Sequence, residues 1–353
     1  MSKKTAVVLF QLGGPDSLEA VKPFLYNLFC DPDIIDFPGA FLARRFLART
    51  ISSLRMKPVA EHYKEIGGKS PILELTNRQA IALEHNLKRE GIDATVFVAM
   101  RYWHPMTDEV VREIKSGGFE RVILLPLYPQ YSRATTLSST NEWNRQAKKQ
   151  RLNGLPAQLI CCYPNHPRMI EAFVDIINKT YEKFGAVGQE EVALLFSAHG
   201  VPVGFINKGD PYQLQVEETV RRILDRGKWK SPSILCYQSK VGPQEWLKPS
   251  LTDTIEKLAR AGRKRMLIIP VAFVTEHIET LHEINIEERE KAEQLGVEKF
   301  EMMPALNDHP KFIECLTDLV LARMETKYDP GSKCLKLWQE KPDRPKPALC
   351  PWM

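Results

Sequence analysis

The segment ERVILLPLYPQYS, at residues 120–132, has a close counterpart in KRMLIIPVAFVTE, at residues 264–276. In each segment a short aliphatic run ends at a proline, which is typical of a buried strand that leads into a turn. A second pair, NHPRMIEAF from Asn165 and DHPKFIECL from Asp308, lies at nearly the same offset. Because two matches at one offset rarely arise by chance, they indicate an internal duplication and predict two similar domains.

Short apolar runs alternate with amphipathic segments along the chain, and this alternation predicts parallel strands joined by crossover helices. The expected strands are Thr5–Phe10, Ala94–Ala99, Arg121–Pro126, Ala157–Tyr163, Val192–Ser197, Ser233–Tyr237, Arg265–Pro270 and Lys299–Met303. Thr76–Glu90 and Tyr212–Asp225 are expected helices between them. We therefore predict an α/β fold of two Rossmann-like domains, each a four-stranded parallel β-sheet flanked by helices. The ligand cleft is expected between them, at the carboxyl ends of the strands.

The duplication also sets the expected domain limits. The N-terminal domain is predicted to take residues 1–163, with an insertion at about 28–67, and the C-terminal domain residues 164–328. We expect a terminal helix at about 309–326, which can pack back on the N-terminal domain. Residues 329–353 are rich in proline and predict an irregular tail.

The composition is that of an ordinary globular chain. Of the 353 residues, 26% are charged and 43% are hydrophobic, and the net charge of +5 is too small to indicate a nucleic-acid partner. No apolar stretch approaches the roughly 20 residues of a membrane span, and the first residues lack a signal-peptide pattern. None of the seven cysteines forms a C-x-x-C pair, so a zinc knuckle is not expected. We predict a cytoplasmic protein with reduced thiols.

Residues that could bind a ligand or act in catalysis follow several expected strands. His199 lies between Ala198 and Gly200, whose small side chains would leave its ring accessible; a ligand or base and a turn histidine bonded to backbone are both open interpretations. Gly13-Gly14 lacks both the full dinucleotide fingerprint and a Walker lysine, which favours a plain tight turn over a phosphate loop.

A row of glutamates opens the helix expected after the strand at Arg265–Pro270. Glu279, Glu283 and Glu287 recur at i, i+4 and i+8, which would stack them on one helical face. Since like charges at that spacing repel, the row indicates a path for cations or protons, although a solvated face remains the alternative. The H-E-x-x-H and G-x-S-x-G patterns are absent, which argues against a zinc hydrolase and a serine hydrolase.

The remaining strand-end residues are large and aromatic, with one cation, Arg101. The aromatic ones are Tyr63, Tyr102, Trp103, Tyr128, Tyr131, Trp246 and Phe273. Aromatic walls combined with a cation, a histidine and carboxylates suit a large, flat, apolar ligand with acidic edges.

Eight motifs follow one another in a characteristic order: QLGGPDSLEAV, YKEIGGKSPI, RYWHP, LYPQYS, LFSAHGVP, NKGDPY, YQSKVGPQEWL and PVAFVTEHIETLHEINIE. In these motifs, from about Val7 to Leu321, the chain resembles the ferrochelatases. The resemblance implies a lyase of haem biosynthesis that inserts Fe²⁺, its metal substrate, into protoporphyrin IX and releases two protons. It also implies the class II chelatase-like fold, with the porphyrin in a cleft between the two domains.

The resemblance assigns expected roles to individual residues. His199 and Glu279 match the pair that binds metal or removes pyrrole protons, and the sequence does not say which does which. His277 matches a second histidine of the site, and Glu283 continues the acidic path. Two further groups of substrate-binding positions are expected: Arg101, Tyr63 and Ser70 near the propionates or the porphyrin rim, and Leu12, Tyr102, Trp246 and Phe273 along the walls.

The sequence departs from part of the family in its cysteines. Members with a [2Fe–2S] cluster have a cysteine where this chain has Ala172, and three more near the C-terminus, where this chain has only Cys334 and Cys350. Because four thiolates are needed, no cluster is expected. Glu276 stands where many relatives have Asp.

Residues 41–57 contain a basic amphipathic pattern, which predicts either peripheral contact with the inner face of the membrane or a helix packed on its own domain. The sequence does not indicate the oligomeric state or the iron donor. Alternatives from other classes are a coproporphyrin or cobalt chelatase of the same fold and a non-enzymatic porphyrin or haem carrier. A carrier would have no need for carboxylates opposite a histidine.

Overall fold

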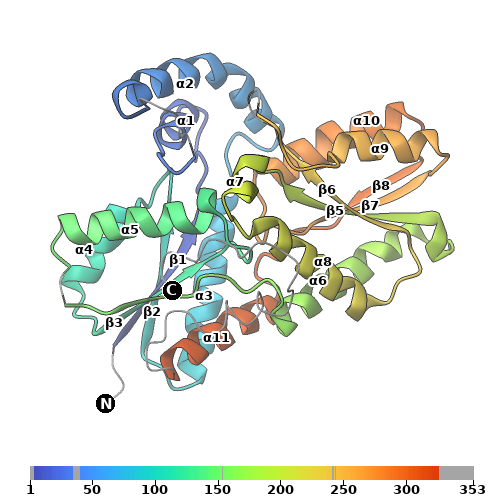
Figure 1. The fold of residues 1–353 in the computed structure, drawn as a ribbon. Helices are drawn as coiled ribbons and strands as arrows, with labels where there is room; N and C mark the ends of the chain where they lie inside the picture. The colour runs from blue at the N-terminus through green and yellow to red at the C-terminus, as the bar shows by residue number, and fades with distance from the viewer. Residues whose placement is uncertain (1–3, 35–39, 153, 241, 243, 326–353) are drawn as a thin grey trace. The chain divides into compact units, whose positions relative to one another are not determined.

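The computed structural model describes residues 4–34, 40–152, 154–240, 242 and 244–325 (Figure 1). The predicted tail at 329–353, with Cys334 and Cys350, lies outside the described residues.

The chain forms two compact units that meet in sequence between Cys162 and Tyr163. The last described helix, α11 (Pro310–Glu325), is divided between the units: its residues up to Cys315 belong to the second unit, and those from Leu316 belong to the first. The domain limits expected from the duplication stay a prediction.

The first unit is built on a parallel sheet with the strand order β2-β1-β3-β4. Its strands are β1 (Thr5–Gln11), β2 (Ala94–Met100), β3 (Arg121–Pro126) and β4 (Ala157–Leu159). Thr5 of the central strand β1 is opposite Ala94 and Arg121. All of β1 is buried, which explains why its sequence is continuously apolar instead of alternating.

The first unit also contains helices and one short π-helix. They are α1 (Val21–Phe29), α2 (Ala40–Glu65), α3 (Ile72–Arg89), α4 (Thr107–Ser116), η1 (Arg133–Leu137) and α5 (Ser138–Lys149). Val110 and Ile114 of α4, with Trp143 of α5, pack against the face of β1 that carries Val8 and Phe10. These side chains form the core of the unit.

The second unit repeats the same topology, with the strand order β6-β5-β7-β8. Its strands are β5 (Val192–His199), β6 (Ser233–Gln238), β7 (Arg265–Pro270) and β8 (Lys299–Met302). All pairs are parallel, and His199 at the end of β5 is opposite Gln238 at the end of β6. The carboxyl ends of these strands therefore lie at one edge of the sheet.

The second unit has more irregular helical segments than the first. They are α6 (Pro167–Tyr181), η2 (Glu182–Phe184), η3 (Gln189–Glu191), α7 (Val203–Asn207), α8 (Tyr212–Gly227), α9 (Leu251–Arg260), η4 (Glu279–Glu288) and α10 (Arg289–Gln294). η2 and η3 are 3₁₀-helices, whereas η4 is a ten-residue π-helix. Leu251 of α9, Ile284 of η4 and Ala292 of α10 pack in one core cluster with Ile268 of β7.

The predicted fold class is confirmed, since two parallel sheets of four strands are present. Two strands are shorter than predicted. β8 ends at Met302, one residue early, and β4 ends at Leu159, not Tyr163, because it pairs with Val122–Leu124 of β3 and with no further segment of the described residues. The helix expected at Thr76–Glu90 is α3, which begins earlier, at Ile72.

The predicted basic amphipathic segment lies in α2, which runs to Glu65 and passes through Pro58. Two of its large apolar side chains, Phe46 and Leu54, are 71% and 74% exposed. Among the described residues, no helix combines the length and the apolar character that crossing a membrane requires.

Candidate active site

A carboxylate between two imidazoles lies at the carboxyl edge of the sheet in the second unit. Glu279 Oε1 is 3.6 Å from His199 Nε2, and Glu279 Oε2 is 3.3 Å from His277 Nε2. His199 ends β5, whereas His277 and Glu279 follow β7. The side chains of His199 and Glu279 keep 34% and 22% of their surface exposed, so a ligand can reach both.

Backbone carbonyls fix the orientation of both imidazoles. His199 Nδ1 is 2.6 Å from the carbonyl oxygen of Gly200, and His277 Nδ1 is 3.0 Å from that of Thr275. Because a carbonyl oxygen only accepts, each Nδ1 carries the proton that it donates. Nε2 is the ring nitrogen that approaches Glu279 in both residues: a protonated ring donates to the carboxylate there, and a neutral ring offers a lone pair to a ligand.

The two imidazoles control the charge of Glu279. Burial by itself raises the pKa of this carboxyl group, but the charge of His199 and the hydrogen bond and charge of His277 outweigh it and lower the pKa to about 2. For His277, burial lowers the pKa, and the hydrogen bond and charge of Glu279 outweigh that effect, so the pKa is raised. Glu279 is consequently an anion at neutral pH.

Glu283, one π-helical turn along, has the opposite electrostatic behaviour. Its Oε2 accepts hydrogen bonds from Ser239 Oγ at 2.5 Å and from Gln238 Nε2 at 3.5 Å. Burial first, and then the negative charge of Glu279, raise its pKa, against the lowering effect of the Ser239 hydrogen bond. Two neighbouring carboxyl groups with pKa values shifted apart are typical of a site that separates charge stabilisation from proton transfer.

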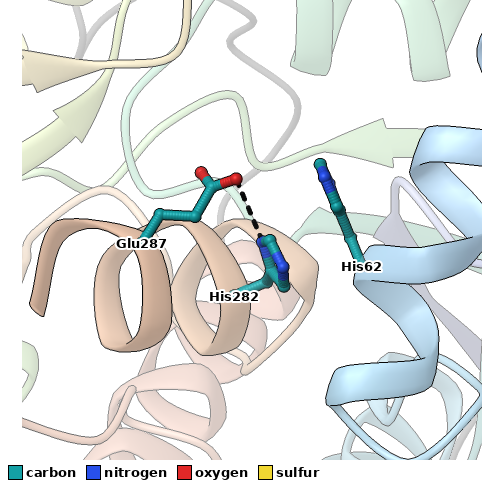
Figure 2. Close-up of side chains that lie close together, drawn as sticks. All are labelled: His62, His282 and Glu287. Carbon is teal, nitrogen blue, oxygen red and sulfur yellow. Dashed lines mark ion pairs between the residues drawn. The ribbon is translucent and has the colours of Figure 1, made fainter. Parts of the chain in front are cut away.

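The helix expected to carry the three glutamates is the π-helix η4 and not an α-helix. Its hydrogen bonds join residues five apart, so each turn holds more residues than an α-helical turn. That the three glutamates share one face of this helix stays a prediction. Glu287 is 51% exposed and lies 3.6 Å from Nδ1 of the buried His282, an ion pair drawn in Figure 2. Hydrogen bonds to Glu283 and this pairing of Glu287 offset the repulsion that the spacing implied.

Two aromatic rings border the imidazole of His199. The ring of Phe273 is 6.4 Å from that of His199 and 4.8 Å from that of His277, and the ring of Trp246 is 6.4 Å from His199. The predicted wall positions Trp246 and Phe273 are thus brought together with the predicted pair His199 and Glu279.

Arg101 and Tyr102, which follow β2, lie in a buried polar cluster of the first unit. Arg101 Nη2 is 2.9 Å from Asp31 Oδ2, and Arg101 Nε donates to Ser138 Oγ at 2.8 Å. Tyr102 is fully buried and its hydroxyl donates to Asp31 Oδ2 at 2.7 Å. The guanidinium expected near a ligand is only 9% exposed, so most of its donors serve the protein interior.

Of the other three predicted residues of the first unit, two are buried and one, Leu12, is partly buried. Tyr63 is 2% exposed on α2, and Leu12 packs against the core. Ser70 is 7% exposed and its Oγ accepts from the backbone N–H of Ile72. A Cβ on Gly14 would lie 2.5 Å from Ser70 Oγ, so close packing requires a glycine at this position.

Sequence reasoning missed several residues of these clusters. Gln238, Ser239 and Ser197 bond to one another or to the glutamates, and the motif YQSKVGPQEWL directly after a strand was the available signal for the first two. Asp31 gave no signal, because a lone aspartate in a predicted insertion resembles any turn residue.

The chain is similar to named proteins along most of its length. The family model Ferrochelatase matches residues 4–324. The ferrochelatase of Geobacter metallireducens is 48% identical over 320 residues, 91% of this chain and 98% of the relative. That of Trichodesmium erythraeum is 43% identical over 324 residues, 91% of this chain and 83% of the relative.

Solved structures with the same fold are more distant in sequence. SirB from Bacillus subtilis with Fe³⁺ has a TM-score of 0.54 at 12% identity, covering 92% of this chain and 100% of that one. The sirohydrochlorin chelatase SirB from Bacillus subtilis subspecies spizizenii in complex with cobalt has a TM-score of 0.51 at 10% identity, with 91% and 96% covered. At these identities the likeness concerns the fold alone, and it confirms the chelatase-like architecture.

Proposed function

The chain belongs to the ferrochelatase family, and we propose that it inserts Fe²⁺ into protoporphyrin IX and releases two protons to give protohaem. The observation that carries the proposal is the Glu279 carboxylate held between the imidazoles of His199 and His277, at the carboxyl edge of a parallel sheet. Imidazole and carboxylate are ligands that suit ferrous iron, and the same groups accept protons.

The electrostatics support different roles for Glu279 and His199. Glu279, whose pKa is about 2, is a weak base and a permanent anion, so it attracts Fe²⁺ and compensates its charge. His199 directs Nε2 to the same place and, when neutral, accepts a pyrrole proton there. Because Nε2 has a single lone pair, His199 contacts the metal substrate and takes up a proton at different stages in this proposal, whereas Glu279 stays in contact with the metal.

Glu283 is the next acceptor for the released protons in this proposal. Its raised pKa makes it a better proton acceptor than Glu279, and its hydrogen bonds to Ser239 and Gln238 hold it next to that residue on η4. Glu287, half exposed on the same π-helix, connects this position to solvent. The role of the acidic path is thus a proton exit.

The substrate side of the proposal rests on two aromatic rings beside His199. Those of Phe273 and Trp246 suit a flat macrocycle, and because Phe273 is 9% exposed, it has to move before a ligand can stack on it. The motif YQSKVGPQEWL resembles the form found in the protoporphyrin enzymes more than that of the coproporphyrin enzymes, which supports the proposed substrate. Arg101, Tyr63 and Ser70 remain proposed propionate or rim contacts, and because each is less than a tenth exposed, contact requires these side chains to rearrange.

A substrate comparison tests the proposed specificity. The protein is incubated anaerobically with protoporphyrin IX or coproporphyrin III, and with Fe²⁺ or Co²⁺, while the porphyrin absorption bands are followed. The highest kcat/KM is expected for protoporphyrin IX with Fe²⁺. A preference for coproporphyrin or for cobalt overturns the specificity, and tight haem binding without metal insertion identifies a carrier.

Peripheral membrane contact is proposed for α2, whose exposed Phe46 and Leu54 accompany several arginines. Flotation with anionic liposomes at low salt is expected to carry the protein upward, and its failure to do so removes this proposal. A [2Fe–2S] cluster is not part of the proposed enzyme, and iron and sulfide analysis of the purified protein is expected to find none.

A further inference from the structure

Gln238, the last residue of β6, bonds to both halves of the site described above. Its backbone carbonyl accepts the N–H of Gly200, the residue next to His199, at 2.7 Å. Its side-chain Nε2 donates to the backbone carbonyl of Glu279 at 3.0 Å. Gln238 is 6% exposed and lies opposite His199 in the strand register. One residue therefore links the end of β5 to the first turn of η4.

A buried serine supports the orientation of this amide. Ser197 Oγ, which is fully buried, is 2.8 Å from Gln238 Oε1, and Gln238 Nε2 is also 3.5 Å from Glu283 Oε2. If the amide were flipped, Oε1 would face a carbonyl oxygen and a carboxylate, which are acceptors only. The observed orientation places a donor there, and the hydroxyl of Ser197 then has to donate to Oε1.

We propose that Gln238 is a positioning residue for metal insertion: it holds the first turn of η4, and with it the Glu279 carboxylate, at its distance from His199, while Ser197 fixes the Gln238 amide. The inference rests on the proposed function and deepens it. The backbone carbonyl that Gln238 binds belongs to Glu279 itself, so any displacement of that turn displaces the carboxylate. A glutamine has the required length and, unlike a glutamate, brings a donor to two acceptors.

The first test replaces the amide. Gln238→Glu keeps the shape but puts a carboxylate oxygen against the Glu279 carbonyl and Glu283, and Gln238→Ala removes the link. Loss of a group that orients a metal-binding residue typically costs about 10- to 100-fold, so kcat for haem formation is expected to fall by that factor. The KM for protoporphyrin is expected to stay unchanged, because the proposal gives Gln238 no porphyrin contact.

The second test asks whether Ser197 acts through Gln238. Ser197→Ala alone is expected to lower kcat about 2- to 10-fold, the size of one hydrogen bond. In the Gln238→Ala background the same change is expected to have no further effect, since its partner is already gone. Ser231→Ala is the matched control: it removes another buried serine hydroxyl, bonded to the Gln189 carbonyl and located just before β6, and should leave kcat unchanged.

The outcomes separate the two proposals. Wild-type protein that forms no haem refutes the proposed function, whereas an active wild type with equally active Gln238→Glu and Gln238→Ala variants refutes only the positioning role. Additive losses in the double variant, or a loss confined to the KM for protoporphyrin, also overturn it. Melting temperatures are measured alongside, and a kcat loss that follows the melting temperature across all variants, control included, points to a structural role instead.

Discussion

His199 and Glu279 carry the chemistry of the proposed reaction at the scale of single residues. Their side chains meet at 3.6 Å, and His277 holds the second oxygen of the same carboxylate. The low pKa of Glu279 and the raised pKa of Glu283 give two carboxyl groups of one helix different tasks. The arrangement depends on the side chains and equally on the backbone carbonyls that fix the orientation of the two imidazoles.

Substitution of either residue is expected to stop turnover without unfolding the protein. His199→Ala removes the proposed proton acceptor and should lower kcat by at least about 100-fold, the usual contribution of a general base. Glu279→Gln should be similarly impaired, while quenching of protein fluorescence still reports porphyrin binding. Turnover close to that of the wild type in both variants would show that the pair is not the reacting centre.

The site residues could be predicted from sequence to different extents. His199 and Glu279 could be proposed from the sequence, because each follows an apolar strand within a distinctive motif. The burial of Arg101 could not be predicted, since nothing in RYWHP reveals that Asp31, 70 positions earlier in the chain, forms an ion pair with it. A partner so distant in sequence becomes visible only when the fold brings the two together.

At the scale of elements, the buried pair of Asp31 and Arg101 joins the turn after α1 to the end of β2 and the start of α5. Asp31→Ala would leave the Arg101 guanidinium buried with its main charge partner missing. Removal of one partner of a buried ion pair costs about 3–5 kcal/mol, so we expect a loss of that size in the free energy of unfolding.

Urea denaturation of wild-type protein and of the Asp31→Ala variant measures this loss. Asp33→Ala is a suitable control, since Asp33 lies in the same turn and bonds to Asn141, a neutral amide, instead of to an arginine. Equal, small losses in the two variants would contradict the importance of the buried pair.

The start of α4 provides a pH-dependent contribution to stability. The Glu109 carboxylate accepts the backbone N–H of Met106 and contacts His104; burial raises its pKa, but these contacts outweigh burial and lower it. Because the folded pKa lies below the unfolded value of about 4.3, the contribution is complete above that pH and is lost as the pH falls through the folded pKa.

Melting temperatures between about pH 6 and pH 3 test this linkage. Wild-type protein should be more stable than Glu109→Gln at pH 6, and the difference should shrink as the solution becomes acidic. Glu113→Gln, an exposed position on the same helix, should show a smaller change with pH. A difference between wild type and Glu109→Gln that is constant over the whole range would disprove the linkage.

Element types were predicted well where the periodicity was strong. Strands such as Arg121–Pro126 and Arg265–Pro270 have the bounds expected from their apolar runs and closing prolines. The π-helix η4 was not predictable, because its apolar and charged residues fit an α-helical period equally well. Its distinctive contacts are tertiary ones. Gln238 donates a hydrogen bond to the backbone carbonyl of Glu279, and Ser239 donates one to the carboxylate of Glu283.

At the scale of the whole molecule, two units with one topology repeat the duplication seen in the sequence. The proposed reacting groups His199, His277 and Glu279 all come from the second unit. In the first unit the buried cluster of Arg101 and Asp31 follows β2, the counterpart of β6, so the two units keep one topology but carry polar clusters at different strand ends.

The most direct test of the account is haem formation itself. Purified protein, free of oxygen, is mixed with protoporphyrin IX and Fe²⁺, and the absorption spectrum is recorded with time against a sample that contains the His199→Ala variant. The porphyrin bands are expected to give way to those of protohaem at a rate proportional to the concentration of wild-type protein, and at least about 100-fold more slowly with the variant. Porphyrin bands that persist with wild-type protein, or that disappear equally fast with the variant, would contradict it.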